Sequence, residues 1–112
     1  MPGPKDISTA LKWIQEAMEA GRYHPAVHFY DRLFEWHLDF EDVIHAIADP
    51  FACETYDRGI PEHEGTCWRI TGPSMTGGRD VSVGVEAYHD KKKHRCILCT
   101  VFDPHAEKEG DR

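Results

Sequence analysis

The sequence lacks any apolar run close to the ~20 residues that a membrane-spanning helix needs. Its first residues, MPGPKDIS, also lack the apolar core of a secretory signal peptide. No internal repeat and no strongly biased segment interrupts the chain, which argues against repeat and low-complexity architectures. These absences predict a soluble, cytoplasmic protein that does not contact the membrane.

Positive charge is also scarce. The chain has 13 Lys and Arg against 20 Asp and Glu, giving a formal net charge of −7 at pH 7. Non-specific binding to nucleic acid requires Lys and Arg to neutralise phosphates, so this balance opposes it. Any site for RNA must therefore be a local cluster of basic residues on an otherwise acidic protein.

Cysteine is limited to Cys53, Cys67, Cys96 and Cys99, and because nothing in the chain indicates secretion we expect reduced thiols. The spacing Cys96-x-x-Cys99 invites a zinc or redox interpretation. In a strand, however, residues three apart point to opposite faces, whereas a shared metal requires both sulfurs on one side. We therefore expect no metal and no cofactor, although the sequence leaves a metal or redox role for the four thiols open.

With 112 residues, of which 40% are hydrophobic, the chain is long enough for one compact domain, residues 1–112, with an ordered core of about 6–104. Ile7, Leu11, Ile14 and Met18 follow spacings of four, three and four, which predicts a helix over residues 7–20. Asp6 or Ser8 can cap this helix at its start, and Gly21 is suited to its end.

A second helix is predicted from about Pro25 to His37, because proline favours the first helical position. The segment Gly21–His24 then becomes a tight connection. A third helix follows, with Asp39 and Asp42 resembling a capping box and Asp49-Pro50 ending it. Its predicted inward residues, and those of the second helix, are Ala26, Phe29, Tyr30, Leu33, Trp36, Phe40, Val43, Ile44 and Ile47.

After Pro50 the pattern alternates, as is typical of strands. Val81, Val83 and Val85 alternate with polar residues and predict a strand with one polar face. The predicted strands are 51–57, 66–72, 81–87 and 96–103, joined by a loop at 58–65, a connection at 72–78 and a charged turn at 90–95, before a frayed tail at 104–112. The order indicates an α+β fold in which two to three N-terminal helices pack on a four-stranded antiparallel meander sheet.

Several short motifs follow one another along the chain in an order that can be compared with known families. They are H-x(3)-R-L from His28, Leu38, Asp42-Val43, E-x-Y at 54–56, W-R-I-T-G at 68–72, G-R-D-V-S-V at 78–83 and I-L-C-T-V-F at 97–102. Over roughly residues 24–104 this order resembles the family called domain of unknown function 4258. The family is thought similar to RelE-like toxins and to small metal-independent ribonucleases such as barnase and the colicin tRNases. The family usually carries a second arginine four residues after the first, where this chain has Trp36.

The resemblance implies a metal-independent endoribonuclease, the toxin of a toxin–antitoxin pair. Such an enzyme needs a base, an acid and a cation beside the scissile phosphate. The candidate catalytic residues are His28, Arg32 and Glu86, and the candidate substrate-binding residues are Arg69, Arg79, Tyr88 and Thr100. We expect His28, Arg32 and either Arg69 or Arg79 to converge on an anion site bordered by Glu86 or Tyr88. The partners implied are RNA or the ribosome, and a cognate antitoxin.

A plainer interpretation stays open for the same residues. His28 can be a helix-edge histidine, Arg32 can pair with Glu35, and the basic run Lys91–Arg95 can be a charged hairpin tip. The alternative function is then a non-catalytic module that binds another protein through an open sheet face or an edge strand. The acidic charge of the chain favours this alternative.

Overall fold

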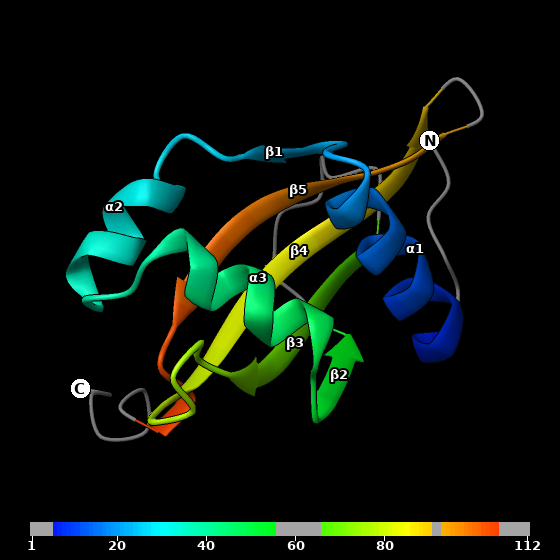
Figure 1. Cartoon of the computed structure of the whole chain (residues 1–112). Helices are drawn as coiled ribbons and strands as arrows, with labels where there is room; N and C mark the ends of the chain where they lie inside the picture. The colour runs from blue at the N-terminus through cyan, green and yellow to red at the C-terminus, as the bar shows by residue number, and fades with distance from the viewer. Residues whose placement is uncertain (1–5, 56–65, 91–92, 106–112) are drawn as a thin grey trace.

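The computed structural model describes residues 6–55, 66–90 and 93–105, within which three helices accompany one five-stranded sheet (Figure 1). The elements are α1 (Ile7–Glu19), β1 (Tyr23–Pro25), α2 (Phe29–Glu35), α3 (Phe40–Ala48), β2 (Ala52–Thr55), β3 (Thr66–Pro73), β4 (Asp80–Asp90) and β5 (Lys93–Phe102). The strand order is β1-β5-β4-β3-β2. α1 and α3 lie across one face of the sheet, and α2 packs against β5 (Figure 1).

The predicted α+β class is confirmed, but the four-stranded antiparallel sheet is wrong in one respect. Tyr23–Pro25 forms an additional strand, which runs parallel to β5 and makes the sheet mixed. The Cys96 amide donates to the Arg22 carbonyl (3.2 Å) and the Ala26 amide donates to the Leu98 carbonyl (2.9 Å). Pro25 is tolerated because this strand lies at the edge of the sheet, where a missing N–H leaves no ladder partner unpaired.

α1 begins and ends as predicted. The Asp6 carboxylate accepts a hydrogen bond from the Thr9 amide at 2.8 Å, and Gly21 follows the helix with a φ of 75°. The buried stripe differs from the expected one. The fully buried residues are Ala10, Ile14 and Ala17, whereas Ile7 is 48% exposed, because the two alanines allow the helix to approach the sheet closely.

Side chains of α1 and its C-terminal connection also attach to the β4–β5 hairpin. The Trp13 indole donates to the Tyr88 carbonyl at 3.1 Å, and the Trp13 ring stacks on His94 at 4.2 Å between centroids. His94 Nδ1 lies 2.8 Å from Glu16 Oε1, and Arg22 Nε donates to the His94 carbonyl at 2.9 Å. These contacts join residues more than 70 positions apart in sequence.

The second helix is shorter than the predicted one, which ran from about Pro25 to His37. α2 occupies only Phe29–Glu35, and His28 is its N-cap residue. The chain then turns through His37, which has a φ of 56°, and α3 starts with the predicted capping box between Asp39 and Asp42. α3 buries Val43, Ala46 and Ile47, while the Ile44 side chain, predicted to point inward, is 38% exposed.

β4 is the central strand of the sheet, and it is not half-buried as predicted. Every residue from Val81 to Ala87 is buried, including Ser82 and Glu86 on the face opposite the helices. Ser82 is satisfied there by Thr71, whose hydroxyl lies 2.8 Å from that of Ser82. Both faces of β4 are therefore covered, and the open sheet face expected for partner binding does not exist at this strand.

The strand boundaries shift by a few residues from the predicted ones. The charged residues around 90–95 mostly extend the two strands, because β4 continues to Asp90 and β5 starts at Lys93. Residues 56 and 57 of the first predicted strand, the loop at 58–65 and most of the tail lie outside the described residues.

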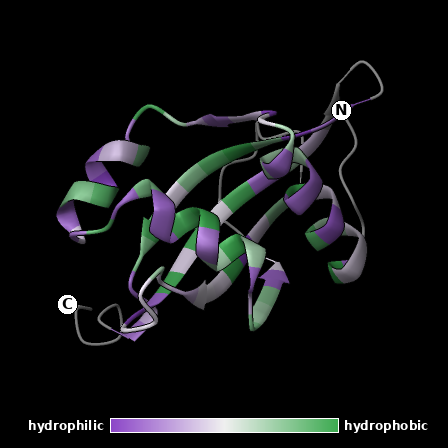
Figure 2. Cartoon of the chain, in the orientation of Figure 1, coloured by the Kyte–Doolittle hydropathy of each residue, from purple (hydrophilic) through white to green (hydrophobic). Residues whose placement is uncertain are grey.

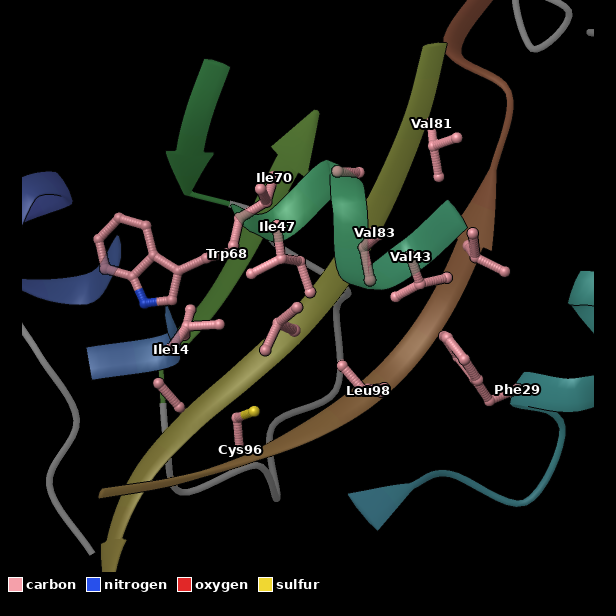
Figure 3. Packing of buried hydrophobic residues seen from close by; sticks show 14 of the residues in the cluster. Ile14, Phe29, Val43, Ile47, Trp68, Ile70, Val81, Val83, Cys96 and Leu98 are labelled. Carbon is pink, nitrogen blue, oxygen red and sulfur yellow. The ribbon is translucent and has the colours of Figure 1, made fainter. Parts of the chain in front are cut away.

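One cluster of buried side chains joins the helices to the sheet (Figure 3). Figure 2 shows hydrophobic segments of the central strands passing beneath α3, with hydrophilic segments toward the strand ends. At the centre of this contact Gly72 lies against the backbone of α3, and a Cβ added there would collide with the Ala46 carbonyl and lie 2.9 Å from Ala46 Cα. Gly72, predicted at the junction of a strand and the following connection, lies within β3 and is a packing residue of that strand.

Replacing Gly72 with alanine should therefore destabilise the fold. Because the added methyl meets backbone, which cannot rotate away, we expect the free energy of unfolding to fall by about 1–3 kcal/mol. Urea denaturation measures this change. Gly78→Ala is the matched control, since its nearest neighbour would be Thr76 Oγ1 at an ordinary 3.7 Å. Equal stability of the two variants would contradict the packing role of Gly72.

Candidate functional site

A hollow of about 330 Å³ lies beside the start of α2. Its lining comes from the segment before α2, from α2 and from β5, namely Ala26, Val27, His28, Arg32, Cys99 and Thr100. β1 stops pairing with β5 at Leu98, whereas β5 continues to Phe102, so the hollow lies where the paired edge ends. Three of the predicted site residues, His28, Arg32 and Thr100, meet here.

His28 lies at the mouth of this hollow with its side chain 73% exposed. Its Nδ1 is 3.2 Å from Asp31 Oδ2, so the ring has an acidic partner on α2. The Arg32 amide donates to the His28 carbonyl at 3.2 Å, which keeps the two residues one turn apart although His28 precedes the helix.

Arg32 carries the cation expected to hold a phosphate. Its Nη1 donates to both carboxylate oxygens of Glu35, at 3.1 and 3.2 Å, and its side chain is 45% exposed. This is the pairing that the plainer interpretation of the sequence expected. An anion entering the hollow must compete with Glu35 for the guanidinium.

The sheet residues predicted to complete the site lie elsewhere. Glu86 pairs in register with Cys67 and Ile97 on the face opposite the core, with 7% of its surface exposed. Arg69 has its Nε 3.5 Å from Glu54 Oε2 and its guanidinium carbon 5.1 Å from the centre of the Phe102 ring. Neither Glu86 nor Arg69 lines the hollow.

Tyr88 and Arg79 belong to two further regions of the fold. Tyr88 pairs with Arg95 near the tip of the β4–β5 hairpin, where its carbonyl accepts the Trp13 indole. Arg79 Nη1 donates to the Trp36 carbonyl at 2.8 Å, and Nη2 lies 3.4 Å from Asp103. Arg79 thus caps the C-terminal end of α2, where cations are favoured by the helix dipole.

The hollow therefore collects one imidazole, one guanidinium, one hydroxyl group and the thiol of Cys99. The imidazole and the guanidinium each have a carboxylate partner on α2, and the remaining four predicted residues are distributed over the sheet. This arrangement can bind a small polar group beside Thr100. The geometry does not bring a second cation or a buried carboxylate to the same place among the described residues.

A second feature of α2 was not foreseen. Tyr30 is 57% exposed and Phe34 is 82% exposed, although both lie on a helix that buries only Phe29 and Leu33. We name Tyr30 and Phe34 the α2 patch. Its base is fixed by aromatic contacts, because the Tyr30 ring lies 6.3 Å from Phe40 and 6.0 Å from Phe29. The spacing of four between these two aromatic residues is the signal that the sequence contains. Tyr30 was instead predicted on the buried face of the helix.

The cysteines are free thiols in separate surroundings. Cys96 belongs to the core, with its Sγ 4.0 Å from Met18 Sδ, while Cys99 lies at an irregularity of β5 beside the hollow. In the part of the chain that the structure describes, no three His, Cys, Asp or Glu side chains are grouped so that they could hold a metal ion.

A scan of protein-family models and a search of curated proteins found no match to this chain. Within residues 6–55, 66–90 and 93–105, no helix is long and apolar enough to cross a membrane.

The surroundings of Cys96 generate a pH prediction. Burial raises the pKa of the Cys96 thiol from an ordinary 9.0 to about 12, with the nearby Cys99 contributing. The unfolded thiol ionises first, so between about pH 9 and 12 unfolding releases a proton and rising pH favours the unfolded state. Urea denaturation at pH 8 and pH 10 should show a larger loss of stability for the native sequence than for Cys96→Ala. Identical losses would contradict the burial of this thiol.

Proposed function

We propose that this chain is a non-catalytic protein-binding module that contacts its partner through the α2 patch. The observation that carries the proposal is the exposure of Phe34, 82%, on a helix of seven residues. Aromatic residues are enriched at the centres of protein interfaces, where they supply much of the binding energy. Burying such a side chain contributes about 1.5–3 kcal/mol.

The α2 patch is also held in place before any partner arrives. An isolated helix of seven residues is not stable in water, so α2 depends on burying Phe29 and Leu33. At its far end the Trp36 carbonyl is held by Arg79. A surface fixed in this way loses little conformational entropy on binding, which favours affinity.

The test is a pair of matched substitutions. Phe34→Ser removes the most exposed aromatic ring of α2, whereas Phe51→Ser removes a phenylalanine that is 61% exposed next to β2, at the opposite edge of the sheet. A partner purified after affinity capture should bind the Phe34→Ser protein at least roughly tenfold more weakly in calorimetry. Phe51→Ser should bind like the native protein.

Equal affinities of the two variants would contradict a role for the α2 patch in binding. Because both side chains are exposed, each variant should keep the thermal stability of the native fold, which circular dichroism checks.

A second candidate function is the RelE-like endoribonuclease implied by the resemblance to the domain of unknown function 4258 family. One observation favours it, namely that His28, Arg32 and Thr100 line the same hollow. In this proposal His28 moves the proton of a ribose hydroxyl, and Arg32 leaves Glu35 to hold the phosphate. Its partners are RNA and a cognate antitoxin in the cytoplasm.

Incubating the purified protein with RNA in the presence of a chelator tests this candidate. Cleavage should yield a cyclic phosphate without added metal, and His28→Ala should lower the rate about 100-fold or more. His24→Ala is the control, because His24 is an exposed histidine on β1 that does not line the hollow. Absence of cleavage, or equal rates for the two variants, would exclude His28 catalysis.

A further inference from the structure

We propose that the protein segment bound by the α2 patch is basic, carrying Lys or Arg beside its apolar side chains. This inference rests on the proposed function and names the chemistry of the partner. It comes from the charges around Tyr30 and Phe34, which the binding proposal itself does not use.

The region from 27 to 42 is the origin of that charge. It contains five carboxylates, Asp31, Glu35, Asp39, Glu41 and Asp42, and one arginine, Arg32. Two of these carboxylates serve the fold directly, because Asp42 accepts the Asp39 and Met75 amides and Asp39 completes the capping box. Asp31 and Glu35 are 70% and 56% exposed, and each also contacts a basic side chain of the same segment, His28 and Arg32 respectively.

The carboxylates lie beside the aromatic rings on α2. Successive helical residues are about 100° apart, so Asp31 and Glu35 form a strip next to the strip of Tyr30 and Phe34. On the other side, Phe40 touches Tyr30 and is followed by the exposed Glu41. The α2 patch is thus an aromatic surface bordered by the carboxylates of α2, with Glu41 one residue beyond Phe40 on α3.

Charge complementarity selects one occupant for such a surface. A basic segment with an apolar face can bury both aromatic rings and place its cations near the carboxylates. A second copy of this chain would instead oppose acidic borders to each other, and its formal net charge of −7 adds long-range repulsion. RNA carries phosphates and is repelled by the same border.

The probe is a labelled amphipathic helical peptide of Leu and Lys, compared with the same peptide in which Glu replaces Lys. Fluorescence anisotropy should show binding of the Lys peptide and none of the Glu peptide. Phe34→Ser should weaken binding on the order of tenfold. The double variant Asp31→Asn/Glu35→Gln should weaken it roughly threefold or more, and added salt should weaken native binding further.

Matched controls separate the patch from the overall acidity of the protein. Asp49→Asn/Glu54→Gln removes the same number of charges away from α2, and Glu54, like Glu35, has an arginine partner. Phe51→Ser removes an exposed phenylalanine elsewhere. Both controls should retain the native affinity for the Lys peptide.

The inference is overturned if the Lys peptide does not bind, if the Glu peptide binds equally, or if the control pairs match the α2 variants. It is also overturned if sedimentation shows a dimer that Phe34→Ser dissociates, since the occupant is then a second copy. The proposed binding function is tested separately, by comparing the affinities of Phe34→Ser and Phe51→Ser for the purified partner.

Discussion

The hydrogen bonds between β1 and β5 determine where the chain is extended after α1 and where α2 can begin. Once the Arg22 carbonyl and the Ala26 amide are paired with β5, the backbone must stay extended through Pro25. α2 can then begin only at Phe29 and has two turns in which to reach the core. Phe29 and Leu33, four residues apart, share the face of α2 that packs on the core, while Tyr30 and Phe34 share a face that stays in solvent.

Much of the fold could be predicted from local signals. The Asp6 cap, the left-handed Gly21 and the capping box of Asp39 and Asp42 each act within a few residues, and the structure contains all three. The parallel strand β1 could not be predicted in this way, because its partners lie about 70 positions along the chain. Proline at position 25 suits a helix start as well as an edge strand, and only the distant pairing decides between them.

The candidate site was predicted less well, for an electrostatic reason. Arginine was expected to face a phosphate, yet the structure gives Arg32, Arg69 and Arg79 partners within the protein. These are Glu35, Glu54 and, for Arg79, Asp103 together with the Trp36 carbonyl. In a chain with 20 acidic and 13 basic residues, an acidic partner for each cation is the ordinary outcome. Sequence spacing did bring His28 near Arg32, since four residues make one turn, but it could not show which carboxylate each would meet.

The attachment of α1 to the β4–β5 hairpin also bears on how the protein reaches its fold during synthesis. Trp13 and Glu16 have partners at Tyr88 and His94, so the apolar side of α1 has no completed surface to cover until β4 and β5 have been made. Contacts of such long range slow folding and delay the closure of the core. α1 is therefore made well before the strands that bury Ala10, Ile14 and Ala17, and these side chains stay accessible to chaperones in the nascent chain until β4 and β5 follow.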